Sequence, residues 1–85
     1  MTNTELKEKL VNAGFDEVIL FDLEIADAFV AVSADSRAIY DYNKIIDCLV
    51  ENGICEDEYE ATDYINHELV QYSYRKDMPI IIITN

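Results

Sequence analysis

The residues with the greatest chemical potential lie in the stretch RAIYDYNKIIDCL, which runs from Arg37 to Leu49. It places Asp41 between Tyr40 and Tyr42, and a carboxyl group beside phenols could act in acid or base catalysis. Apolar residues then recur at helical spacing, so Asp41 also marks the junction of a strand and a helix. An aspartate there can accept hydrogen bonds from the first helical turn, which stabilises by about 1 kcal/mol. We interpret Asp41 as a helix cap, with Tyr40 packed inward, rather than as a catalytic acid.

The other candidate nucleophiles and bases stand alone in the sequence. His67 is the only histidine and lies two residues past Ile65 in an acidic stretch, so we expect it to be exposed. Cys55 precedes a helix whose dipole would lower the thiol pKa, but three acids follow it and would raise that pKa. Cys48 and Cys55 are separated by a spacing that matches no zinc or redox pattern. We expect both cysteines to be reduced, Cys48 to be buried and Cys55 to be unreactive, and we assign no catalytic residue.

Metal and cofactor sites are not indicated. The stretches DYNK and EDEYE supply oxygen ligands, but neither has the spacing of a calcium-binding loop. Two glycines in the whole chain leave no loop that could cradle a phosphate. We therefore predict no cofactor and no metal ion.

Acidic residues dominate the charge. Eighteen acids against six bases give a net charge of −12. Residues 41–68 hold nine of these acids against Lys44 alone. Such a field repels nucleic acid and anionic membranes and attracts basic protein surfaces. The acids are either the solvated faces of two helices or a surface that competes for a nucleic-acid groove.

Tyrosines accompany the acids. The chain has six tyrosines and no tryptophan, and several of the tyrosines lie in or near acidic sequence. Tyrosine rings are amphipathic and are enriched at protein interfaces. The candidate partner-binding residues are Glu56, Asp57, Glu58, Glu60, Asp63, Tyr59, Tyr72 and Tyr74.

Length and composition predict one small acidic domain over residues 1–85. The chain is 51 % hydrophobic and 28 % charged, which is too apolar for disorder. The first ten residues interleave charges, and no run approaches the ~20 apolar residues of a membrane-spanning helix. We expect a cytoplasmic protein.

The first half of the chain predicts a helix followed by strands. Thr2 and Glu5 form a capping box for a helix over residues 3–13 that ends at Gly14. Three strands are expected after it, joined by short connections, the second of which is a loop of three or more residues without glycine. The predicted strands are Glu17–Phe21, Ala28–Ala34 and Ala38–Tyr40.

The second half predicts a helical hairpin and a last strand. One helix follows Asp41 and stops at Gly53, and Asp57 with Glu60 opens another over residues 58–70. Pro79–Thr84 contains four successive isoleucines, a pattern typical of an interior strand. The predicted fold is α+β, with a three- to four-stranded, mainly antiparallel sheet and three helices in the order α-β-β-β-α-α-β. The first three strands should form a meander, with the fourth inside the sheet or against the first.

Three stretches carry a resemblance to a known family. They are A-x-x-x-V-S-x-D-x-R-x-x-Y-D-Y-x-K-x-I from Ala28 to Ile46, E-A-x-x-Y-I from Glu60 to Ile65, and the closing PIII from Pro79 to Ile82. Together they resemble a family of small proteins of Gram-positive bacteria and their phages and mobile elements, over residues 16–83. The family has a glycine in the hairpin turn, where this chain has Ser36. The resemblance implies a mobile-element setting and carries no catalytic residue.

Two functional hypotheses of different class follow. The first is a non-enzymatic acidic interaction protein of a phage or mobile element that binds a basic host protein, without contacting a membrane. Its sharpest form is an inhibitor of a host defence, of the anti-CRISPR or anti-restriction type, which need not touch nucleic acid directly; a nucleic-acid-binding protein is another form. The second is a small hydrolase or metal-dependent enzyme that uses the acidic patch. The lack of a nucleophile–base pair in the sequence favours the first.

Overall fold

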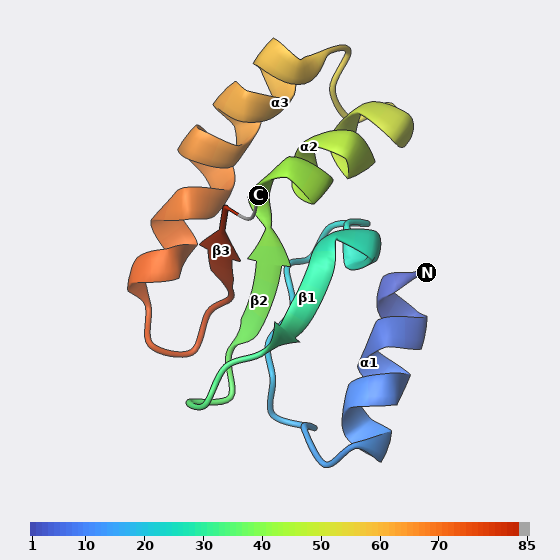
Figure 1. The fold of residues 1–85 in the computed structure, drawn as a ribbon, viewed down its shortest axis with the longest axis vertical. Helices are drawn as coiled ribbons and strands as arrows, with labels where there is room; N and C mark the ends of the chain where they lie inside the picture. The colour runs from blue at the N-terminus through green and yellow to red at the C-terminus, as the bar shows by residue number, and fades with distance from the viewer. Residues whose placement is uncertain (84–85) are drawn as a thin grey trace.

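The computed structural model describes residues 1–83, with all of their side chains except that of Ser73. These residues form an α+β fold with three α-helices and a three-stranded mixed sheet (Figure 1), which confirms the predicted class and, roughly, the predicted order. The elements are α1 (Asn3–Asn12), the 3₁₀ turn η1 (Ala26–Ala28), β1 (Phe29–Val32), β2 (Ala38–Asp41), α2 (Tyr42–Glu51), α3 (Glu58–Tyr64), the π-helical turn η2 (Ile65–Leu69), the 3₁₀ turn η3 (Val70–Tyr74) and β3 (Ile80–Ile82).

Two helices begin where the sequence places their caps. The Thr2 hydroxyl accepts a hydrogen bond from the backbone N–H of Glu5 at 3.2 Å. The Asp57 carboxylate accepts one from the backbone N–H of Glu60 at 2.9 Å. Each bond satisfies an N–H group that has no partner within its helix.

Two helices also end as predicted, each at a glycine in the left-handed region. Gly14 has φ +90° and Gly53 has φ +72°. After α2, the N–H of Gly53 bonds to the carbonyl of Val50 (3.1 Å) and that of Ile54 to the carbonyl of Leu49 (3.0 Å). This pair of bonds closes the helix and satisfies two of its last carbonyl groups.

The junction at Asp41 is where predicted, but the predicted cap hydrogen bond is wrong. Asp41 precedes α2 and is 3 % exposed, yet its side chain accepts no bond from the first helical turn. It is still the last residue of β2, paired with Ile82, so the strand sets the direction of its side chain. Tyr40 is fully buried, as predicted, with its ring centroid 5.0 Å from that of Phe21 and 6.0 Å from that of Phe29.

The hairpin of β1 and β2 closes without glycine. The strands pair antiparallel, and the loop between them runs from Ser33 to Arg37. The N–H of Ser33 donates to the carbonyl of Arg37 (2.8 Å), and Ser36 has φ +63°. Ser36 therefore takes the left-handed conformation that glycine adopts most easily.

The predicted first strand, Glu17–Phe21, is wrong. This segment has no regular secondary structure and passes behind the sheet (Figure 1). Val18 and Phe21 are buried in the core, while side chains of α1 bind the segment's carbonyl groups. Lys7 Nζ donates to the carbonyl of Val18 at 3.0 Å and Asn3 Nδ2 to that of Phe21 at 3.2 Å. The apolar residues of this segment pack under the sheet instead of forming a strand. The predicted meander of three strands is therefore a hairpin of two strands.

The last strand lies at an edge of the sheet, neither inside it nor against the first strand. β3 runs parallel to β2, with Ile80 opposite Ile39 and Ile82 opposite Asp41. Parallel neighbours need a long crossover, and α2 and α3 supply it here. The sheet is therefore mixed rather than mainly antiparallel. Thr84, the last residue of the predicted strand, lies outside the described residues.

The core lies on one face of the sheet. It is formed by side chains of α1, of the irregular segment under the sheet, of α2 and of the helical arm, together with Tyr40, and includes Leu6, Phe21, Ile45, Leu49 and Ile65. The helical arm, defined as α3, η2 and η3, extends to Tyr74 rather than to residue 70 as predicted. It lies on the β3 side of the sheet, with α1 on the β1 side (Figure 1).

Candidate functional site

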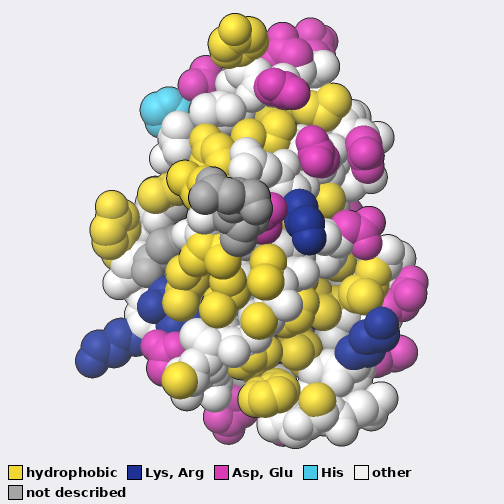
Figure 2. All heavy atoms as spheres, viewed as in Figure 1, with side chains coloured by type: hydrophobic (Ala, Val, Ile, Leu, Met, Phe, Trp, Pro, Cys, Tyr) yellow, Lys and Arg dark blue, Asp and Glu magenta, His cyan; other side chains and the backbone are white. Residues whose placement is uncertain are grey.

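The predicted acidic residues are all on the surface. Figure 2 shows Asp and Glu side chains gathered at the end of the molecule where α3 begins. We call the five predicted carboxylates the acidic end, and every one of them is exposed: Glu56, Asp57, Glu58, Glu60 and Asp63. Within residues 1–83, no Lys or Arg side chain forms an ion pair with any of the five; the ion pair that is present joins the Met1 amino group to Asp27 at 2.8 Å. The acidic end therefore keeps an uncompensated negative field.

The structure divides the predicted tyrosines into two groups. Tyr59 is 86 % exposed and lies among the carboxylates of the acidic end. Tyr72 and Tyr74, 36 % and 86 % exposed, lie in η3 at the opposite end of the helical arm. Tyr59 can therefore act with the acidic end, whereas Tyr72 and Tyr74 belong to another part of the surface.

The two cysteines are buried and free. Burial raises the pKa of the Cys55 thiol, and the nearby charges of Glu60 and Asp57 raise it further. Burial is also the main cause that raises the pKa of Cys48. A raised pKa keeps a thiol protonated and weakly nucleophilic, as predicted for Cys55. His67 is exposed, also as predicted.

Metal-ligating side chains are not clustered in the part of the chain that the structure describes. No group of three or more His, Cys, Asp or Glu residues there could hold a metal ion. In the same residues, no helix combines the length and apolarity needed to cross a membrane.

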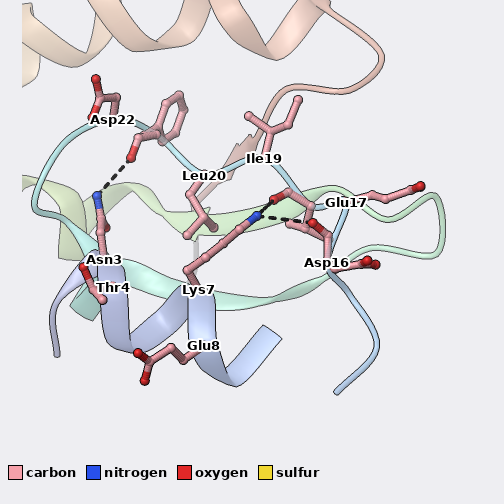
Figure 3. A pocket seen from close by; sticks show the side chains of 11 residues that line it. Asn3, Thr4, Lys7, Glu8, Asp16, Glu17, Ile19, Leu20 and Asp22 are labelled. Carbon is pink, nitrogen blue, oxygen red and sulfur yellow. Dashed lines mark hydrogen bonds between the residues drawn. The ribbon is translucent and has the colours of Figure 1, made fainter. Parts of the chain in front are cut away.

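A first hollow separates α1 from residues 16–22 (Figure 3). It has a volume of about 690 Å³ and an apolar floor that includes Val18 and Phe21. Lys7 reaches across it and donates to the carbonyl groups of Val18 (3.0 Å) and Asp16 (3.4 Å). Asn3 Nδ2 closes one end of it by donating to the carbonyl of Phe21, as the dashed line in Figure 3 shows. Because its one cation is used to hold the segment, this hollow serves mainly to fix residues 16–22 against α1.

A second hollow lies between residues 20–23 and the helical arm. It has a volume of about 310 Å³. Its lining combines apolar side chains, two tyrosines and two carboxylates: Leu20, Phe21, Asp22, Leu23, Tyr64, Glu68, Leu69, Tyr72 and Met78. Among these residues there is no Lys, Arg or His, so its charge is entirely negative.

Sequence reasoning selected only Tyr72 from the second hollow. The signal it missed is the recurrence of Tyr64, Glu68 and Tyr72 every four residues, a spacing that places side chains on one side of a helix. On the opposite wall, Leu20 and Phe21 belong to the segment that was predicted to be a strand, and Asp22 and Leu23 follow directly after it. If this segment were a strand, its backbone would pair with a neighbouring strand of the sheet. The prediction therefore gave no reason to expect a hollow between this segment and the helical arm.

The face of the sheet opposite the core is apolar. Ile39, Ile80 and Ile82 are half-buried and do not belong to the core cluster, although they share the sheet with Tyr40. Figure 2 shows hydrophobic side chains gathered over the strands on this side of the molecule. The four successive isoleucines predicted an interior strand, which would be covered on both faces of the sheet. The core covers only one of these two faces.

Comparison with known proteins adds no relative. No protein-family model, curated protein or solved structure gives a significant match to the chain.

Proposed function

We propose that this protein is a non-enzymatic interaction protein that binds a basic protein surface through the acidic end. The observation that carries the proposal is the exposure of five carboxylates around the start of α3 with no Lys or Arg paired to any of them among residues 1–83. Unpaired exposed acids raise the rate at which a positively charged partner is encountered and disfavour negatively charged ones.

Tyr59 completes this surface. Its ring is 86 % exposed, in the first turn of α3 between Glu58 and Glu60. Tyrosine is enriched among the residues that dominate binding energy at interfaces, because its ring buries apolar area and its hydroxyl stays hydrogen-bonded. Tyr59 would serve as the anchor, with the carboxylates providing orientation and speed of association.

The resemblance to proteins of phages and mobile elements suggests the class of partner. Such elements meet host nucleases whose grooves are basic because they bind nucleic acid. An acidic protein that occupies such a groove would inhibit the nuclease without touching nucleic acid itself. The proposal in its sharpest form is an inhibitor of a host defence, of the anti-CRISPR or anti-restriction type.

The test is charge reversal combined with salt dependence. A partner isolated from host lysate would be titrated with the wild-type protein and with the triple variant Glu56→Lys, Glu60→Lys, Asp63→Lys, which changes the net charge from −12 to −6. The variant should bind roughly tenfold more weakly or worse, a loss of about 1.4 kcal/mol. Its melting temperature should change little, because surface changes usually stay within about 0.5 kcal/mol each. Wild-type binding should also weaken steeply between about 50 and 500 mM salt.

A second triple variant controls for net charge alone. Glu8→Lys, Glu17→Lys and Asp77→Lys make the same change of six charges at exposed positions outside the acidic end. This variant should retain most of the affinity. A partner whose affinity is the same for both triple variants, or is indifferent to salt, would refute the proposal.

A further inference from the structure

The second hollow has the size of a socket for one side chain. At about 310 Å³ it lies at the lower end of the range for ligand pockets, roughly 300–1,000 Å³. Leu20, Leu23, Leu69 and Met78 supply its apolar surface. A slender apolar stem would fit along these side chains, whereas a nucleotide-sized cofactor would fill far more volume.

The charged side chains that line the second hollow are all negative. Glu68 lies between Tyr64 and Tyr72 on the helical arm, and Asp22 lies on the opposite wall. Both carboxylates are exposed, so both stay available to a ligand. With no cation in the lining, the hollow favours a positively charged group and disfavours an anion.

The helical arm changes its geometry at this point. Its π-helical turn, Ile65–Leu69, contributes Glu68 and Leu69 to the hollow. Single π turns within helices are rare and are frequently found at functional sites. Here the turn lies between the two tyrosines that line the hollow.

We propose that the second hollow is a socket for an arginine side chain of a partner protein. The inference rests on the proposed function, since it names the residue by which a basic partner would be held. Guanidinium is planar, stacks on aromatic rings, and pairs with carboxylates through two parallel hydrogen bonds. Tyr64 and Tyr72 supply the rings, Glu68 and Asp22 the carboxylates, and Leu20 a surface for the aliphatic stem. Lysine lacks the planar group and is more strongly hydrated, so arginine fits this lining better.

Three blocked tripeptides test the chemistry of the socket. Acetyl-Gly-Arg-Gly-amide, its lysine counterpart and its citrulline counterpart would each be titrated into the ¹⁵N-labelled full chain, with amide shifts recorded at low salt. Citrulline has nearly the shape of arginine but no charge. The arginine peptide should shift the amides of residues 20–23 and 64–72 and bind more tightly than the lysine peptide. The citrulline peptide should bind most weakly.

Substitutions then locate the binding. Glu68→Gln should weaken the arginine peptide roughly two- to fivefold, because it removes one of two exposed carboxylates. Glu51→Gln, an exposed acid on α2 that does not line the hollow, makes the same change in net charge and should have no effect. Tyr72→Leu keeps an apolar side chain but removes a ring, and should also weaken binding roughly two- to fivefold.

The outcomes separate this socket from the acidic end. Equal binding of the arginine and citrulline peptides, equal effects of Glu68→Gln and Glu51→Gln, or shifts confined to other residues would each overturn the socket. If the socket fails while partner binding still depends on salt and on the acidic end, the proposed function stands. If the arginine peptide binds as expected while partner binding ignores the acidic end, the proposed function fails and the socket stands.

Discussion

Replacing Tyr40 with phenylalanine should stabilise the protein. Tyr40 is fully buried between Phe21 and Phe29, and its hydroxyl has no hydrogen-bond partner among the described residues. The backbone of Phe21 lies near the hydroxyl but does not meet the geometry of a hydrogen bond. Tyr40→Phe keeps the ring and both aromatic contacts and removes only the buried oxygen.

The size of the effect follows from the cost of that oxygen. A buried polar group without a partner costs about 1–3 kcal/mol relative to its hydrated state. The space that the oxygen leaves offsets part of this gain, because lost volume in a core is itself destabilising. We expect Tyr40→Phe to raise the free energy of unfolding by about 1 kcal/mol. For a domain of this size that corresponds to a rise in melting temperature of about 4–8 °C.

Urea unfolding at pH 7, followed by circular dichroism, measures this change. Tyr59→Phe is the matched control, because the same oxygen is removed from a side chain that is 86 % exposed. The control should stay within about 0.5 kcal/mol of the wild type. A loss of 1 kcal/mol or more in Tyr40→Phe would show that the hydroxyl is hydrogen-bonded in the folded protein and would refute the reasoning.

The raised pKa of Tyr40 also predicts how the stability of the protein changes at alkaline pH. Burial raises the pKa of Tyr40 to about 12, whereas an unfolded tyrosine has a pKa of about 10. The contribution of this shift to stability is therefore complete below pH 10. It is lost as the pH rises from 10 toward 12, because only the unfolded state then releases the proton. The loss amounts to about 2–3 kcal/mol and should be absent in Tyr40→Phe, so the two proteins should differ most in stability above pH 10.

Two further substitutions test the local geometry. Ser36→Gly should raise the free energy of unfolding, measured with urea, by about 0.5–1 kcal/mol. Ser36 has φ +63°, and the steric cost of this left-handed conformation exceeds the entropy that glycine adds to the unfolded state. An unchanged or lower stability would contradict this. Asn3→Ala should destabilise by about 1–2 kcal/mol, because Asn3 Nδ2 donates to the carbonyl groups of both Leu23 (2.7 Å) and Phe21 (3.2 Å). The exposed neighbour Thr4→Ala is its control, and equal effects of the two changes would count against the role of Asn3.

The sequence by itself determined the features that depend on near neighbours. Thr2 and Asp57 cap helices, and Gly14 and Gly53 end them, because each bond or backbone angle involved lies within a few residues of the cap. The exposure of the acidic end was also predictable, because charged side chains that are close together in the sequence are solvated by water and need no partner from elsewhere in the chain.

Only the tertiary structure decided which segments become neighbours across the chain. The apolar run at Glu17–Phe21 reads equally well as a buried strand or as a packed irregular segment, and its environment is set by Asn3 and Lys7 of α1. The position of β3 beside β2 depends on the α2–α3 crossover rather than on the isoleucines themselves. The second hollow depends on residues 20–23 lying beside the helical arm, so that Asp22 and Glu68, far apart in the sequence, line the same space. Periodicity shows which face of an element is buried, but the choice of partner depends on packing and pairing over the whole chain, which no local pattern encodes.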